Sequence, residues 1–154
     1  MSKQFWLLKS EPNTYSIDDL RRDGTTCWSG VRNFQARNFM RDQMRIGDGI
    51  LFYHSNVPPM GVSGFAEVVR VGYPDQTAWN PKDLHYDPKS LPDSPIWFMV
   101  DIRYVRHCRT VITLAQMKAH PALQKMVVVQ RGTRLSVQPV RPNEWEVVSS
   151  LAFA

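Results

Sequence analysis

The sequence lacks the features that define several large classes of protein. Its 154 residues contain no unbroken apolar run close to the ~20 residues that a membrane helix requires. Residues 1–12 reach charged side chains too early for a secretory signal. Only two cysteines are present, Cys27 and Cys108, without a Cys-x-x-Cys motif or a Cys/His cluster. We therefore expect a single cytoplasmic domain, residues 1–154, with no membrane partner and with both thiols reduced and buried.

Signatures of the common enzyme classes are also missing. There is no Gly-x-Ser-x-Gly elbow, no Walker loop and no dinucleotide fingerprint. The four histidines lie at spacings that form no paired metal site, and His85 with Asp87 is more typical of a solvated loop than of a metal centre. We therefore expect no metal and no cofactor. Lys9 and Glu11, two residues apart at a predicted strand end, form either an acid–base pair or a surface ion pair.

The charge that is present is mostly positive and mostly arginine. The formal net charge is +5, and the 19 basic residues comprise 13 arginines and 6 lysines. An excess of positive charge favours polyanionic partners, and the planar guanidinium donates two parallel hydrogen bonds to a phosphate. Nucleic acid is therefore the leading predicted partner.

Periodicity and turn residues predict more strands than helices. Residues 15–24 form a short helix because Ser16 and Asp19 make a capping box and Gly24 ends it. The predicted strands are 4–12, 48–55, 61–72, 96–108 and 133–140. The other predicted helices are 33–45, 113–126 with a break before Pro121, and 142–153 with Asn143 as its cap. These elements predict an α+β fold, a small and strongly bent mixed sheet or barrel with short helices packed outside.

The predicted helix 33–45 is amphipathic. Asn33 is its expected N-cap and Gly47 offers a left-handed C-cap. Apolar side chains fall on one side of the helix, and an arginine stripe falls on the other. The predicted phosphate-binding residues are Arg37, Arg41 and Arg45 on this stripe, with Arg32 beside the predicted pocket loop.

Three clusters of polar and aromatic residues follow predicted strand ends, at 9–11, 27–33 and 52–56. A nucleobase needs an aromatic face for stacking and hydrogen-bonding groups around its rim. Both are offered here. The candidate stacking residues are Trp28, Tyr53 and Trp97, although Trp97 could equally be a core residue; the candidate rim residues are Ser10, Asn33, His54 and Ser55.

Five segments together resemble a known family. "WLLKSEP", "WSGVRNFQARNFMR", "GDGILFYHSN", "PIWFMVD" and "RLSVQPV" occur in the order and at the separations of the EVE domain, over essentially the whole chain. The resemblance implies a PUA-like pseudo-barrel surrounded by short helices. EVE domains are similar to YTH domains, which hold a methylated adenine in an aromatic cage, and are candidate readers of modified bases in DNA or RNA.

The resemblance also implies a base-binding pocket. Its residues would be Ser10, Trp28, Gly30, Val31, Asn33, Tyr53, His54 and Ser55, with Trp97, Ser136 and Gln138 in second place. The leading hypothesis is a non-catalytic module that binds a modified nucleobase. The alternatives are an ASCH-like hydrolase of modified nucleosides that uses Lys9 and Glu11, and a protein-binding scaffold that uses the proline-rich segment from Tyr73 to Pro95. The sequence does not distinguish DNA from RNA, and it leaves the modification and the oligomeric state open.

Overall fold

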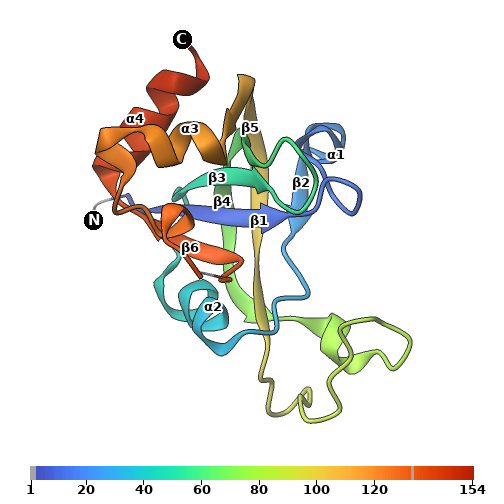
Figure 1. Cartoon of the computed structure of the whole chain (residues 1–154). Coiled ribbons are helices and arrows are strands. Elements are labelled where there is room, and N and C mark those ends of the chain that lie inside the picture. Colours follow the sequence, from blue (N-terminus) through green and yellow to red (C-terminus); the bar gives the residue numbers. More distant parts are fainter. Residues whose placement is uncertain (1–2, 133) are drawn as a thin grey trace.

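A computed structural model describes residues 3–132 and 134–154 of the chain. It contains one six-stranded mixed sheet in the order β2-β5-β4-β3-β1-β6 (Figure 1). The strands are β1 (Phe5–Ser10), β2 (Thr25–Cys27), β3 (Gly49–His54), β4 (Gly61–Pro74), β5 (Phe98–Thr113) and β6 (Val137–Val140). Strands β1 and β3 are parallel, whereas the other neighbours are antiparallel.

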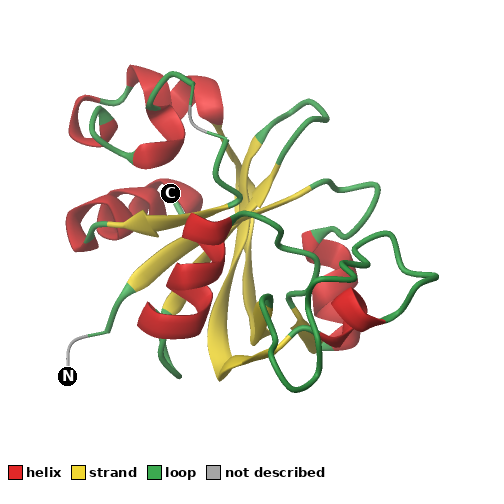
Figure 2. Ribbon diagram, turned by 90° about the horizontal axis from the view of Figure 1, so that it is seen from below, coloured by secondary structure: helices red, strands yellow, loops and turns green. Residues whose placement is uncertain are grey.

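The sheet is strongly bent, as predicted. Strands β4 and β5 run across the direction of β1 and β3 in Figure 1. The register between β4 and β5 shifts at four places, and such bulges bend a strand and increase its twist. The helices around this sheet are α1 (Ile17–Asp23), α2 (Phe34–Asn38), α3 (Leu114–Ala119) and α4 (Pro142–Ala152), with the helical turns Phe39–Gln43, Gln76–Trp79, Pro121–Leu123 and Val127–Val129. Figure 2 shows the helices around the outside of the twisted strands. The predicted α+β architecture is therefore confirmed.

Alternation along the strands divides the apolar side chains into two clusters. In β1, Trp6 and Leu8 belong to the first cluster, and Leu7 between them belongs to the second. The first cluster contains residues of α1 and α2, and the second contains residues of α3 and α4. In Figure 1, α3 and α4 lie above β1 and α2 lies below it.

The sequence located most elements and misplaced several ends. The predicted strands within 4–12, 48–55, 61–72 and 96–108 correspond to β1, β3, β4 and β5. Of the strand predicted at 133–140, Val137–Val140 forms strand β6, residues 134–136 are not part of a strand, and Thr133 lies outside the described residues. The short strand β2 was not predicted, because three residues are too few to show a period.

The predicted helix 33–45 ends early. Asn33 caps α2 as expected, but the helix continues only as a π-turn to Gln43, and Met44 is extended. The cause is Asp48, whose carboxylate accepts hydrogen bonds from Arg45 N–H at 2.9 Å and from the indole N–H of Trp6 at 2.9 Å. Asp48 is buried, so this satisfied carboxylate fixes the turn after the helix.

Two further local predictions were wrong. Helix α4 is capped by Arg141 rather than Asn143, because Pro142 takes the first helical position and Glu144 accepts the Arg141 N–H at 2.9 Å. Cys27 is exposed, whereas Cys108 is buried as expected and its thiol pKa is raised to about 12 by burial. Both cysteines are free.

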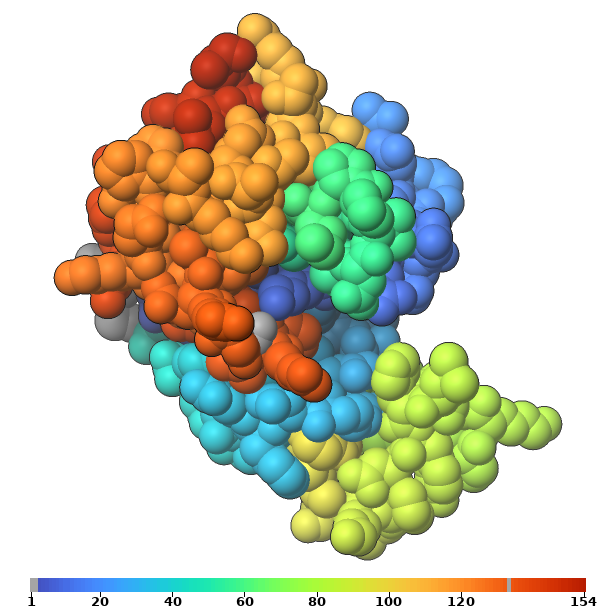
Figure 3. Space-filling model, in the orientation of Figure 1, coloured from blue at the N-terminus to red at the C-terminus, as the bar shows by residue number. Residues whose placement is uncertain are grey.

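The segment between β4 and β5, residues 75–97, is here called the excursion. It forms a separate lobe, lime to yellow, at the lower right of the space-filling view (Figure 3). Within the described chain, no helix has the length and apolar character needed to cross a membrane.

Candidate functional site

A pocket of about 530 Å³ opens between the excursion and the ends of β1 and β2. In Figure 3 a notch separates the lime lobe from the blue N-terminal segment above it, and residues from both sides line the pocket. The volume lies within the ~300–1,000 Å³ typical of small-ligand sites. The lining residues are Lys9, Ser10, Glu11, Thr14, Tyr15, Thr26, Cys27, Trp28, Ser29, Gly30, Val31, Arg32, His85 and Ser136.

Trp28 is both a wall of the pocket and part of the core. Its backbone N–H donates to the carbonyl of Val100 at 2.7 Å, which continues the sheet past β2. Its ring packs edge-on against Phe52, with centroids 5.5 Å apart and planes at 85°. Only 9% of Trp28 is exposed, so the ring presents a limited surface in a fixed orientation.

The loop after Trp28 brings backbone to the pocket. Gly30 has a φ of +84°, which favours glycine, and its N–H donates to Asp75 Oδ2 at 2.8 Å. A Cβ at this position would lie 2.7 Å from Cε1 of His85. Val31, the next residue, is buried and lines the pocket beside Trp28.

The polar lining is organised around the end of β1. The hydroxyl of Ser10 donates to the Tyr15 carbonyl at 2.6 Å, and the Ser136 carbonyl accepts the Lys9 N–H at 2.9 Å. Burial lowers the pKa of the Lys9 ammonium group. Glu11 Oε1 accepts a hydrogen bond from the Asn56 amide at 2.6 Å. Lys9 and Glu11 therefore both line the pocket, and the carboxylate is held from outside it.

Three residues predicted at the end of β3 and just after it do not line the pocket. Tyr53 is 3% exposed and packs in the second cluster, on the other side of the sheet from Trp28. His54 is half-buried, and its Nε2 accepts the backbone N–H of Ile17 at 3.1 Å, at the first turn of α1. Ser55 meets Ser10 through the backbone, where its N–H donates to the Ser10 carbonyl at 2.9 Å. Strand alternation and a helix cap explain these differences.

Asn33, Trp97 and Gln138 also serve the fold rather than line the pocket. The Asn33 side chain accepts the Ala36 N–H at 3.0 Å as the cap of α2. Trp97 is 5% exposed, and its indole N–H donates to Asp87 Oδ2 at 2.7 Å. Gln138 is buried, and its amide donates to the carbonyl of Leu135 at 2.8 Å.

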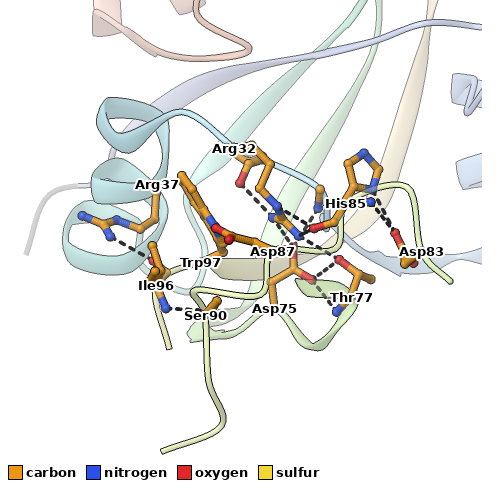
Figure 4. A network of polar contacts seen from close by, with 12 residues as sticks. Arg32, Arg37, Asp75, Thr77, Asp83, His85, Asp87, Ser90, Ile96 and Trp97 are labelled. Atoms are coloured by element: carbon orange, nitrogen blue, oxygen red, sulfur yellow. Dashed lines mark hydrogen bonds and ion pairs between the residues drawn. The ribbon is translucent and has the colours of Figure 1, made fainter. Parts of the chain in front are cut away.

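The predicted arginine stripe is not a uniform outward face. Arg32 lines the pocket, but its guanidinium pairs with the buried Asp75 at 3.0 Å and also donates to the carbonyl of His85 (Figure 4). Arg37 donates to the carbonyl of Ile96 at 2.9 Å and is only partly exposed.

Arg41 and Arg45 are exposed, and Arg41 pairs with Asp42 at 2.8 Å. Arg45 lies beyond the end of the helix, so a helical stripe does not include it. Phosphate binding by these arginines stays a prediction.

Buried Asp75 holds the excursion against the pocket loop. Burial acts to raise its pKa, but hydrogen bonds from Thr77, Gly30 and Arg32 outweigh burial and lower it. The carboxylate therefore remains charged beside Arg32.

His85 is the lining residue that sequence reasoning assigned to a solvated loop. It lies 53 residues beyond Arg32, and no local pattern indicates that they meet. Thr26 and Tyr15 also line the pocket and were not predicted to do so. Thr26 lies in β2, which was not predicted, and Tyr15 lies just before α1. Among the described residues, no group of three or more His, Cys, Asp or Glu side chains could hold a metal ion.

Fold and site together define a PUA-like domain whose pocket lies at strand ends. Residues 4–151 match the model of the EVE domain, and the chain belongs to this family. Thymocyte nuclear protein 1 of Homo sapiens is 43% identical over 165 residues, which cover 95% of this chain and 72% of the human protein.

Solved structures share this fold. A hypothetical protein from Leishmania major is 46% identical with a TM-score of 0.93, covering 98% of this chain and 95% of its own. Human THYN1 in complex with 5-methylcytosine-containing DNA is 40% identical with a TM-score of 0.91, covering 97% of this chain and 98% of its own. A mutant ASCH protein from Zymomonas mobilis, at 14% identity and a TM-score of 0.54, covers 97% of this chain and 99% of its own and shares the fold alone.

Proposed function

We propose that this chain is a binding module that captures a modified nucleobase, without turnover, in the pocket beside Trp28. One observation carries the proposal: the open pocket combines a fixed aromatic wall with hydroxyl and backbone groups. The human relative at 40% identity was solved with 5-methylcytosine-containing DNA, which supports this class of ligand. We therefore take methylated DNA as the first ligand to test and methylated RNA as the second, and we propose the cytoplasm as the place of binding.

The energetics allow such a reader to work by binding alone. Extruding a base from a duplex costs a few kcal/mol, and contact with an aromatic side chain returns about 1–3 kcal/mol. A methyl group buried in an apolar niche adds only about 0.8 kcal/mol. Selectivity for a modified base therefore also needs polar groups at the pocket wall that reject the wrong base edge.

Replacing Trp28 by phenylalanine tests the proposal. Alanine is unsuitable here because Trp28 packs on Phe52 in the core, and truncating a buried tryptophan costs about 3–5 kcal/mol. Phenylalanine keeps an aromatic ring and shortens the pocket wall, so we expect affinity for a 5-methylcytosine oligonucleotide to fall about tenfold. Fluorescence anisotropy measures the affinity, and thermal unfolding checks the fold.

Trp145→Phe is the matched control. Trp145 is partly buried in the second cluster, stacked on Phe5 at 4.5 Å, and is not part of this pocket. We expect Trp145→Phe to bind like the wild type. Equal affinity of Trp28→Phe and the wild type would remove Trp28 from the site, and a wild-type protein without affinity for any methylated oligonucleotide would overturn the proposal.

A hydrolase is the second candidate function. The observation that favours it is that Lys9, with a lowered pKa, lines the same pocket as Glu11. Incubation with acylated and alkylated nucleosides, followed by chromatography, separates the candidates. Turnover that disappears in both Lys9→Ala and Glu11→Gln would establish the hydrolase in place of the reader.

A further inference from the structure

The imidazole of His85 covers the backbone of Gly30 with its face. A Cβ placed on Gly30 would lie 2.7, 2.8 and 2.9 Å from Cε1, Nε2 and Nδ1 of the ring. An edge-on approach would bring one ring atom much closer than the other two, so the near equality indicates contact through the face. The space that the missing Cβ of Gly30 leaves free is therefore occupied by the ring of His85.

The backbone of His85 is held firmly at the rim. Its carbonyl accepts two hydrogen bonds from Arg32, at 3.0 Å from Nε and 2.7 Å from Nη2. Its N–H donates to Asp83 Oδ1 at 2.8 Å. Figure 4 shows Arg32 at the centre of these contacts, with Asp75 on its other side. Arg32 is thus a positioning residue for His85.

The two ring nitrogens of His85 have different surroundings. Nδ1 lies 3.3 Å from Asp83 Oδ1, and the carboxylate favours a proton on that nitrogen. This tautomer leaves Nε2 as a hydrogen-bond acceptor. No residue in the described part of the chain donates to Nε2, and 46% of the side chain is exposed. In Figure 4 the second nitrogen points away from Asp83. The pocket wall therefore carries one acceptor without a protein donor.

We propose that His85 determines base specificity by accepting a hydrogen bond at Nε2 from the exocyclic amino group of the bound base. This inference rests on the proposed function, which it makes specific for amino-bearing bases such as 5-methylcytosine. Thymine carries the same methyl group but presents the O4 acceptor where cytosine presents the N4 amino donor. In thymine, O4 would face Nε2 as a second acceptor, so binding would leave both groups unpaired.

The pocket leaves room for this contact without moving His85. The pocket has a volume of about 530 Å³ with the imidazole of His85 in its wall. This volume lies within the ~300–1,000 Å³ of ligand pockets, so a base can enter beside the ring. His85 is accordingly a wall residue and not a plug.

The test compares single-stranded oligonucleotides that differ at one position, 5-methylcytosine, cytosine or thymine. Single strands remove the difference in pairing energy between duplexes. We expect the wild type to prefer 5-methylcytosine to thymine by about tenfold, because an unpaired buried acceptor costs about 1–3 kcal/mol. In His85→Ala this ratio should fall close to one, and His85→Gln should restore part of it because the glutamine oxygen can accept.

Two further variants complete the design. Tyr86→Ala changes the neighbouring residue, which is 41% exposed and does not line the pocket, and should keep the wild-type ratio. Arg32→Met should lower the ratio by releasing His85, and the double variant with His85→Ala should be no lower than His85→Ala alone.

The outcomes separate this inference from the proposed function. A wild type that binds none of the three oligonucleotides, either as DNA or as RNA, overturns both. A wild type that binds 5-methylcytosine while His85→Ala keeps its ratio to thymine overturns the role of His85 and leaves the reader in place. Tighter binding of all three oligonucleotides by His85→Ala would show that the ring obstructs the pocket, and would also overturn the inference.

Discussion

The two sides of the sheet treat their aromatic residues differently. Trp28 and Tyr53 both lie next to strand ends, and both are almost fully buried. Tyr53 belongs to the cluster that α3 and α4 complete, whereas Trp28 belongs to the cluster that borders the pocket. The contrast teaches that an aromatic residue at a strand end borders a pocket where the surrounding helices leave that end uncovered.

The largest effect should come from the covered side. Tyr53→Ala removes a buried ring, and the cavity should destabilise the fold by about 3–5 kcal/mol. Tyr53 does not line the pocket, although the ammonium of the pocket-lining Lys9 lies 5.8 Å from the centroid of its ring. The protein that stays folded should therefore bind a 5-methylcytosine oligonucleotide almost like the wild type. Urea unfolding gives the stability, and anisotropy at low temperature gives the affinity. A loss of affinity in fully folded Tyr53→Ala would contradict the division between the two sides.

A smaller effect should separate strain from contact at the pocket. Gly30→Ala and Gly24→Ala each place a side chain at positive φ, +84° and +76°, which costs about 1–2 kcal/mol. A Cβ on Gly24 meets nothing within 4 Å, whereas on Gly30 it meets the His85 ring. Both variants should lose similar stability from backbone strain, and Gly30→Ala should lose somewhat more from the contact.

Only Gly30→Ala should bind 5-methylcytosine oligonucleotides more weakly, because it displaces His85. Urea unfolding gives the stability of both variants, and fluorescence anisotropy gives their affinity for the oligonucleotide. If Gly24→Ala weakened binding equally, the effect would come from general destabilisation and not from the pocket loop.

Sequence reasoning recovered the sheet because its information is local. The apolar run of β1 and the capping box of Ser16 with Asp19 each lie within a few residues, and the structure contains both. The end of the predicted helix 33–45 was misplaced because Asp48 forms contacts with Trp6, 42 residues away. A carboxylate acting over that separation leaves no periodic signal.

Only part of the pocket was predicted, because most of its residues are brought together by long-range contacts. Trp28, Gly30, Val31, Ser10 and Ser136 do line one pocket. Trp28 and Ser10 were predicted from the residues alone, and the family resemblance added Gly30, Val31 and Ser136, because no local rule pairs β1 with the segment before β6. By contrast, the side of the sheet to which each β3 side chain points follows from the alternation of side chains along a strand.

Successive side chains at the end of β3 point to opposite sides of the sheet, so His54 and Tyr53 lie on different sides. His54 shares the side of Phe52, against which its ring packs edge-on at 5.7 Å. The side of the sheet that borders the pocket thus carries Trp28, Phe52 and His54 in contact, but the Nε2 of His54 accepts the Ile17 N–H at the start of α1.

The smallest expected effect is a pH dependence that tests this use of His54. Its Nε2 accepts the Ile17 N–H at 3.1 Å. Protonation would place an N–H on Nε2 opposite the Ile17 N–H, and the hydrogen bond would be lost. Burial lowers the pKa of His54, an effect that Asp18 opposes and His107 reinforces. The unfolded chain, with a histidine pKa of about 6.5, therefore binds the proton more readily than the folded protein. The contribution of His54 to stability is complete above about pH 6.5 and is lost as the pH falls through its lower folded pKa.

Urea unfolding at pH 7.5 and at pH 5 measures this loss, and His54→Gln, whose amide oxygen can still accept the Ile17 N–H, removes the titrating group. We expect the stability difference between wild type and variant to shift toward the variant at the lower pH. A difference that stays constant between the two pH values would show that neutral His54 does not stabilise α1 through the Ile17 N–H. His54 would then again be a candidate for contact with a ligand.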